Sequence, residues 1–181
     1  MSGGASEATL AADAQVILAT QRWLERVVIG LNLCPFARAP FVQQRLRYRV
    51  SHALDEQILL ADLSAELLAL HSADPQQCET TLLIHPDVLG DFLDYNDFLA
   101  VANDALRELG LDGELQIASF HPDYQFADTA HDAIENHTNR SPHPTLHLLR
   151  ETSTDDIYRR NIATLRALGL AGWRKLMRDD I

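Results

Sequence analysis

The stretch that decides the fold is TTLLIH, at residues 80–85. It is short and almost continuously apolar, which is the pattern of a strand covered on both faces. Pro86 follows it, and because proline cannot donate to a β-ladder, the strand has to end there. Upstream, RLRYRVS at residues 45–51 alternates apolar side chains with arginines. This alternation predicts a half-buried strand with one basic face.

Helical and strand patterns continue outward from these two segments. Apolar residues recur at helical spacing over residues 10–29, 53–71 and 94–109, and Asp94 is the expected N-cap of the third of these helices. Two further strands are expected at LQIASF (115–120) and TLHLLR (145–150). A last helix is expected over residues 153–168, followed by a short one near 173–177.

The order of these elements predicts the fold class. Two consecutive strand–helix–strand units imply that the first three strands run parallel, while the direction of the fourth stays open. We therefore predict a single α/β or α+β domain over residues 9–181. Its core would be a roughly four-stranded, mostly parallel sheet with helices packed on it. Residues 1–8 are small and polar and are expected to form a disordered tail.

Composition excludes several classes of function. The chain has 181 residues, and its formal net charge of −11 disfavours a nucleic-acid or anionic-membrane partner, since phosphate binding needs a concentrated basic face. There is no signal-peptide pattern and no apolar run of transmembrane length, so a cytoplasmic protein is expected. The two cysteines, Cys34 and Cys78, do not form a disulfide framework and are expected to be reduced.

A repeated exit motif suggests where a functional site lies. TLLIHPD (81–87) and IASFHPD (117–123) both end an apolar strand with His-Pro-Asp. If the two strands are parallel, His85 and His121 share the C-terminal edge of the sheet, where open α/β sheets bind ligands. The alternative is that His-Pro-Asp is only a good strand-exit turn.

The segment 121–144 is a long polar loop that supplies further candidate residues. It lacks glycine and contains three prolines, which favours a fixed path, and long ordered loops are often functional. Arg140, flanked by Asn139 and Ser141, has the donors to bind a carboxylate or phosphate, although a structural ion pair would also explain it. We add Asn136, Arg150 and His85 as candidate ligand-binding residues.

The candidate catalytic residues are expected at the same C-terminal edge of the sheet. His121 is the expected general acid or base because the pKa of histidine lies near neutrality. Asp123 would orient it, and Tyr124 would serve as a second acid. Cys34, in LCPFA, would be a nucleophile only if its loop covers this edge and its pKa is lowered. The alternative for Cys34 is a buried small hydrophobe.

The sequence identifies no cofactor. A divalent metal is one open alternative, with His85, His121 and Asp123 as its ligands, joined by His143 or His147. No spacing matches HExxH or another local metal motif. The motifs GxGxxG, GxxxxGK[ST] and GxSxG are also missing, so dinucleotide-fold, P-loop and serine-hydrolase functions lack support.

Several strings in order carry a family resemblance: VIGLNLCPFA (28–37), ETTLLIHP (79–86), DFLDYNDFL (91–99), FHPDYQFADT (120–129) and RNIATLRALG (160–169). Together they resemble the bacterial family catalogued as domain of unknown function 1415, over nearly the whole chain. The resemblance implies a bacterial, stand-alone, cytosolic domain, and it brings no catalytic residue with it. His131 and His143 stand where the family pattern does not lead us to expect histidine, which lowers both as candidate ligands.

The sequence therefore leaves two main classes of function open. The first is a small enzyme acting on a small anionic metabolite, with His121 as acid or base and Asn139 and Arg140 as the anion clamp. A variant of it uses a metal at His85 and His121. The second is a non-catalytic ligand-binding or protein-interaction module. A loop that is purely structural is a third, simpler possibility.

Overall fold

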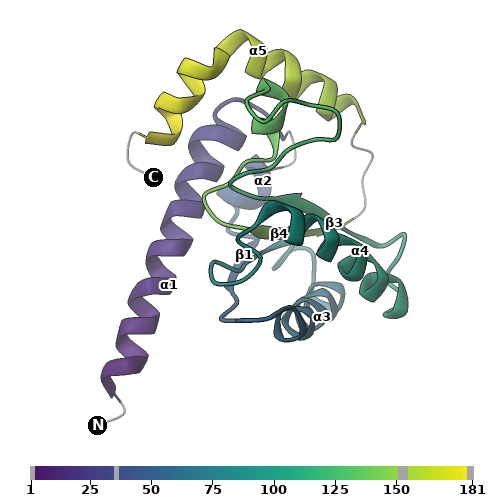
Figure 1. The fold of residues 1–181 in the computed structure, drawn as a ribbon. Coiled ribbons are helices and arrows are strands. Elements are labelled where there is room, and N and C mark those ends of the chain that lie inside the picture. The colour runs from purple at the N-terminus through teal and green to yellow at the C-terminus, as the bar shows by residue number, and fades with distance from the viewer. Residues whose placement is uncertain (1–2, 35–36, 151–154, 179–181) are drawn as a thin grey trace.

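A four-stranded sheet between two helical layers forms the body of the computed structural model (Figure 1). The structure describes the chain over residues 3–34, 37–150 and 155–178. The helices are α1 (Gly3–Trp23), η1 (Leu24–Ile29, a π-helix), α2 (Arg38–Val42), α3 (Glu56–Ser72), α4 (Phe92–Glu108), η2 (Ile134–Thr138, a 3₁₀-helix) and α5 (Asp155–Arg178). The strands are β1 (Leu46–Val50), β2 (Thr80–Ile84), β3 (Leu115–Phe120) and β4 (Thr145–Arg150).

The strand order corrects one part of the predicted fold. The order is β1-β2-β4-β3, and within this sheet only the β1–β2 pair is parallel. The prediction of a mostly parallel sheet is therefore wrong, although the α/β content and the single sheet are confirmed. The reason is that β4 inserts between β2 and β3 and runs antiparallel to both. β2 and β3 still point the same way, so the β2–α4–β3 unit is a crossover split by one strand.

Burial explains why β4 rather than β3 takes the inner position. Thr145, Leu146 and Leu148 of β4 are buried, and every residue of β2 is buried, as predicted. β3 is only partly covered after Leu115 and carries polar side chains such as Gln116, which an edge strand tolerates. The strand with more buried apolar surface therefore occupies the centre.

The two helical layers bury different clusters. Helices α3 and α4 cover one face of the sheet, and α1 and α5 lie over the other (Figure 1). The first cluster includes the buried side chains Leu59, Leu63, Leu67, Tyr95 and Phe98, and the second includes Trp23, Val27, Leu165 and Trp173. None of the helices in the described part of the chain has the length and apolarity needed to cross a bilayer.

Helix boundaries follow local chemistry. Asp91, not the expected Asp94, is the N-cap of α4, because its carboxylate accepts from the backbone N–H of Leu93 at 2.8 Å. The two predicted C-terminal helices form one element, α5, bent at Gly169, whose φ of 68° suits glycine. Of the expected tail, residues 1–2 lie outside the described residues, and α1 begins at Gly3.

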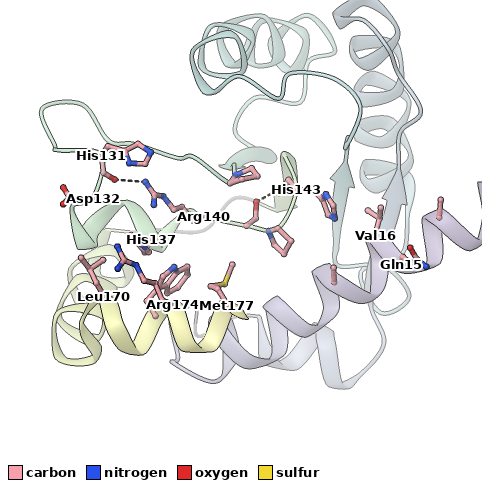
Figure 2. Close-up of a pocket in the computed structure, with 16 residues that line it drawn as sticks. Gln15, Val16, His131, Asp132, His137, Arg140, His143, Leu170, Arg174 and Met177 are labelled. Carbon is pink, nitrogen blue, oxygen red and sulfur yellow. Dashed lines mark hydrogen bonds between the residues drawn. The ribbon is translucent and has the colours of Figure 1, made fainter. Parts of the chain in front are cut away.

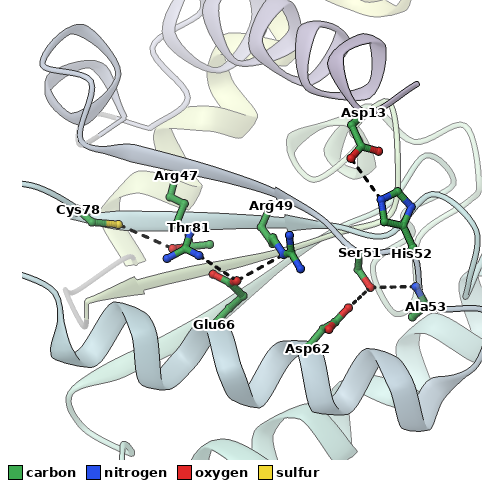
Figure 3. A network of polar contacts seen from close by, with 10 residues as sticks. All are labelled: Asp13, Arg47, Arg49, Ser51, His52, Ala53, Asp62, Glu66, Cys78 and Thr81. Atoms are coloured by element: carbon green, nitrogen blue, oxygen red, sulfur yellow. Dashed lines mark hydrogen bonds and ion pairs between the residues drawn. The ribbon is translucent and has the colours of Figure 1, made fainter. Parts of the chain in front are cut away.

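The predicted basic face of β1 packs over α3. Arg47 and Arg49 both reach Glu66 of α3, with N···O distances of 3.2 and 3.6 Å (Figure 3). Beyond the end of the strand, the Ser51 hydroxyl donates to Asp62 of the same helix at 2.6 Å. These contacts attach the edge strand to its helix, so the arginines of β1 have a structural role.

Tyr95 of α4 joins the helical layer to the ends of two strands. Its side chain is fully buried, and its hydroxyl donates to the Thr145 carbonyl at 3.0 Å and accepts from the Phe120 N–H at 3.1 Å. Phe120 and Thr145 are partners in the β3–β4 register. The hydroxyl therefore satisfies two backbone groups where this ladder ends and the polar loop begins.

We expect Tyr95→Phe to lower the free energy of unfolding by about 1–3 kcal/mol, because it leaves the partly buried Phe120 N–H and the buried Thr145 carbonyl without their partner. Tyr48→Phe is the matched control, since the Tyr48 hydroxyl is buried with no hydrogen-bond partner. Urea denaturation should show no loss for Tyr48→Phe. Equal losses in the two variants would contradict the bridging role of Tyr95.

Candidate functional site

The polar loop leaves and re-enters the sheet at one place. Because β3 and β4 are antiparallel neighbours with Phe120 opposite Thr145, residues 121–144 form one long hairpin connection. Within it, η2 packs against α5 (Figure 1). The loop therefore reaches from the strand ends to the helical layer of α1 and α5.

Asn136 organises this loop from inside. Its side chain is fully buried, and its Oδ1 accepts from the Phe126 N–H at 2.9 Å and the Thr129 hydroxyl at 2.8 Å. Its Nδ2 donates to the carbonyls of Ala130 at 2.8 Å and His131 at 3.2 Å. These four bonds use the full hydrogen-bonding capacity of a carboxamide, so Asn136 has no group left for a ligand.

His121 is placed in a structural network. Its Nδ1 accepts from the Asp123 N–H at 3.0 Å, so its Nε2 carries the proton and donates to the Leu89 carbonyl at 3.2 Å. The ring is fully buried, and this burial lowers the pKa of His121. A neutral ring with both nitrogens occupied cannot act as a general base without first breaking a hydrogen bond.

His85 lies close to His121, as the repeated motif predicted. Both rings pack on Tyr95, with centroids 5.8 and 5.0 Å from its ring. His85 is fully buried, its Nδ1 donates to the Val88 carbonyl at 3.0 Å, and burial lowers its pKa to about 4. The sheet edge therefore brings both histidines together, but inside the protein.

The other predicted residues do not gather around His121. The Asp123 side chain is exposed, and the Tyr124 ring packs between Phe92 and Phe126. Cys34 is partly buried in the cluster under α1 and α5, on the opposite face of the sheet.

Asn139 and Arg150 bond to backbone groups. The Asn139 Nδ2 donates to the Ser119 carbonyl at 3.0 Å. Arg150 lies at the far end of β4, where its Nη2 donates to the carbonyls of Leu70 at 3.1 Å and Ala73 at 3.0 Å. It therefore caps the C-terminus of α3 and has no place in the site.

The metal alternative gains no support from the ligand geometry. Across the residues that the structure describes, no three His, Cys, Asp or Glu side chains are grouped so that they could hold a metal ion. His85, His121 and Asp123 therefore do not form a ligand set. Both ring nitrogens of His121 and the Nδ1 of His85 bond to backbone groups, and Asp123 is exposed.

A groove of about 840 Å³ lies on the other side of the loop, between it, α1 and α5 (Figure 2). Its size is that of a small-molecule site. The loop contributes the side chains of His131, Asp132, His137, Arg140 and His143; α5 contributes Leu170, Trp173, Arg174 and Met177; and α1 contributes Ala12, Gln15, Val16 and Ala19.

Among the predicted site residues, Arg140 lines this groove, and its guanidinium forms no ion pair in the described part of the chain. Its Nε donates to the Tyr124 carbonyl at 3.2 Å and its Nη2 to the His131 carbonyl at 2.7 Å. The guanidinium is partly buried, and this desolvation lowers its pKa, but an arginine stays charged at neutral pH.

His137 lies beside Arg140 and was not among the predicted residues. Only 5% of it is exposed, its ring meets Trp173 edge-on at 4.9 Å, and its Nδ1 has no hydrogen-bond partner. Burial, then the charge of Arg140, then those of Arg174 and His131, lower the pKa of His137 to about 4. One end of the groove thus has two arginines and one carboxylate, that of Asp132, with a neutral histidine in its wall, so this end carries a net positive charge.

The sequence offered only part of this site. Arg140 was predicted, and its neighbours in HTNR made a polar cluster visible. Trp173, Arg174 and the residues of α1 carried no local signal, because only the packing of α1 and α5 places them beside the loop.

The buried histidines predict a pH dependence of stability. Since the pKa of His85 is about 4 in the folded protein and about 6.5 in the unfolded chain, the unfolded chain binds more protons between these values. The contribution of His85 to the free energy of unfolding should therefore fall as pH decreases from 6.5 to 4. Below pH 4 this contribution should stay constant. Urea denaturation across this range measures the slope.

His85→Asn retains a donor near the Nδ1 position and removes the titrating ring. It should reduce the slope of the free energy of unfolding against pH by up to about 1.4 kcal/mol per pH unit, which corresponds to one proton. His147→Gln should act similarly, because burial also lowers the pKa of His147 to about 4. If both variants keep the wild-type slope, the pH dependence does not come from these buried histidines.

Comparison with known proteins places the chain in a family. No curated protein and no solved structure matches it. A family model described as protein of unknown function (DUF1415) matches residues 15–175, from α1 to α5, and confirms the resemblance found in the sequence. The chain therefore belongs to the DUF1415 family.

Proposed function

We propose that the protein is a cytoplasmic bacterial domain that binds a small organic anion at the basic end of the groove. The observation that carries this proposal is Arg140, a partly buried cation whose described hydrogen bonds go to backbone carbonyls and not to a carboxylate. A guanidinium has five N–H donors, so Arg140 keeps donors for a carboxylate or phosphate.

The neighbours of Arg140 strengthen the preference for an anion. Arg174 is exposed on α5 and lines the same end of the groove, and its charge and that of Arg140 both act on His137. Because His137 is neutral, it adds no repulsion to this pair. Burial disfavours the positive charge of Arg140, and the carboxylate of Asp123 offsets this without forming an ion pair with it. A bound anion would stabilise the charge further.

The geometry favours binding over the catalysis expected at His121. The ring nitrogens of His121 are occupied, the side chain is fully buried, and it is not among the residues that line the groove. An enzyme acting at the groove would need another acid or base, such as His143, which lines it and whose pKa is lowered by burial. We therefore favour a ligand-binding domain in which the His-Pro-Asp motifs are structural turns.

The experiment is a thermal-shift series with phosphate and citrate against chloride at equal ionic strength. An anion that binds the folded state raises the apparent melting temperature. Arg174→Gln should weaken binding about tenfold or more, since one charge-assisted hydrogen bond contributes about 1.5–3 kcal/mol. Arg140→Gln should weaken it further and also loosen the loop.

Arg107→Gln is the matched control, because Arg107 lies on α4 and pairs there with Asp104 at 2.7 Å. It removes the same charge from a surface away from the groove and should leave the anion-induced shift unchanged. The proposal fails if Arg174→Gln and Arg140→Gln keep the wild-type shift, or if Arg107→Gln loses it to the same extent.

A further inference from the structure

The groove changes character along its length. In Figure 2, His131, Asp132, His137, Arg140 and Arg174 lie toward one end, His143, Val16 and Gln15 lie toward the other, and Met177 lies between them. Apart from Gln15, the residues that α1 contributes to the groove are small and apolar. An inorganic anion would contact only the basic end of a groove of about 840 Å³.

The wall formed by α1 is apolar except for Gln15. Ala12, Val16 and Ala19 are spaced i, i+4 and i+7, so they lie on one face of the helix. Ala12 is exposed, and Val16 and Ala19 are half-buried. Their small side chains leave room in front of the helix, so this face presents apolar surface to the groove.

The facing wall is held in place by the bend in α5. At Gly169, with φ 68° and ψ 165°, the chain turns so that the last segment of α5 lines the groove. Trp173 is 4% exposed and packs in the same cluster as Met177, which is only partly buried. The groove thus has apolar surface on both sides next to its basic end.

We infer that the ligand is an amphipathic acid, whose carboxylate binds near Arg140 and Arg174 and whose apolar chain lies between Val16 and Met177. This inference rests on the proposed function, because it needs the anion site to place the head group. Each methylene that becomes buried should strengthen binding about fourfold. Two buried methylenes are therefore enough for a tenfold difference between a long and a short acid.

The test compares three probes on the full chain at pH 7 by isothermal titration calorimetry: acetate, octanoate and 1-octanol. Octanoate should bind at least tenfold more tightly than acetate, and more tightly than octanol. Arg174→Gln should weaken acetate and octanoate by the same factor, because both share the head group.

Val16→Gln tests the apolar wall. It should lower the preference for octanoate over acetate at least threefold while leaving acetate unchanged. Leu18→Gln is the matched control, since Leu18 is exposed on the same helix and does not line the groove. It should keep the wild-type preference, and circular dichroism would verify that both variants are folded.

The outcomes separate this inference from the proposed function. Equal affinities for acetate and octanoate, both dependent on Arg174, would overturn the amphipathic ligand and leave the anion site standing. Loss of the octanoate preference in Leu18→Gln as well as in Val16→Gln would also overturn it. Binding of no acid, or of octanol as tightly as octanoate, would overturn both proposals.

Discussion

The buried carboxamide of Asn136 is the interaction on which the candidate site depends. The β3–β4 ladder ends at Phe120 and Thr145, so beyond this pair the loop has no strand partner to satisfy its backbone. From its place in η2, Asn136 forms four hydrogen bonds to residues 126–131, and these bonds fix the path of that part of the loop. Arg140 then bonds two further loop carbonyls. The residue that offers charge to the groove is therefore also part of the loop, and its donors are positioned before any ligand arrives.

Much of the fold could be predicted from apolar patterns, because burial acts on each segment separately. The continuous apolar run of β2 and the alternation in β1 correspond to their burial in the structure. Strand pairing is different, since a strand has the same pattern whether its neighbour is parallel or antiparallel. The long loop before β4 leaves both the direction of this strand and its position in the sheet open. The position depends on which strand buries more apolar surface. Leu146 and Leu148 give β4 that position, and β3 becomes the edge.

The candidate site was less predictable, because the type of a residue does not specify which group its side chain contacts in the folded protein. The His-Pro-Asp motif correctly brought His85 and His121 to one edge, yet there His121 bonds the Asp123 N–H two residues ahead. That is the bond of a strand-exit turn, the simpler of the two interpretations. The groove instead combines a loop with Val16 and Trp173, which lie far apart in sequence. Only tertiary packing could show that Arg140 faces them rather than the two histidines.

The overall charge of the chain constrains how such a site can work. With a formal net charge of −11, the protein as a whole repels anions at long range, so its net charge does not steer an anionic ligand to the groove. At physiological ionic strength this repulsion fades over about 8 Å, and short-range contacts then decide binding. Inside the groove, Arg140 and Arg174 stand close to His137, and their charges help keep it neutral. Apolar contact along α1 does not depend on charge at all. For an acidic protein to select an acid, it would need the two features that this groove combines, a partly buried arginine for the head group and an uncharged wall for the remainder of the molecule.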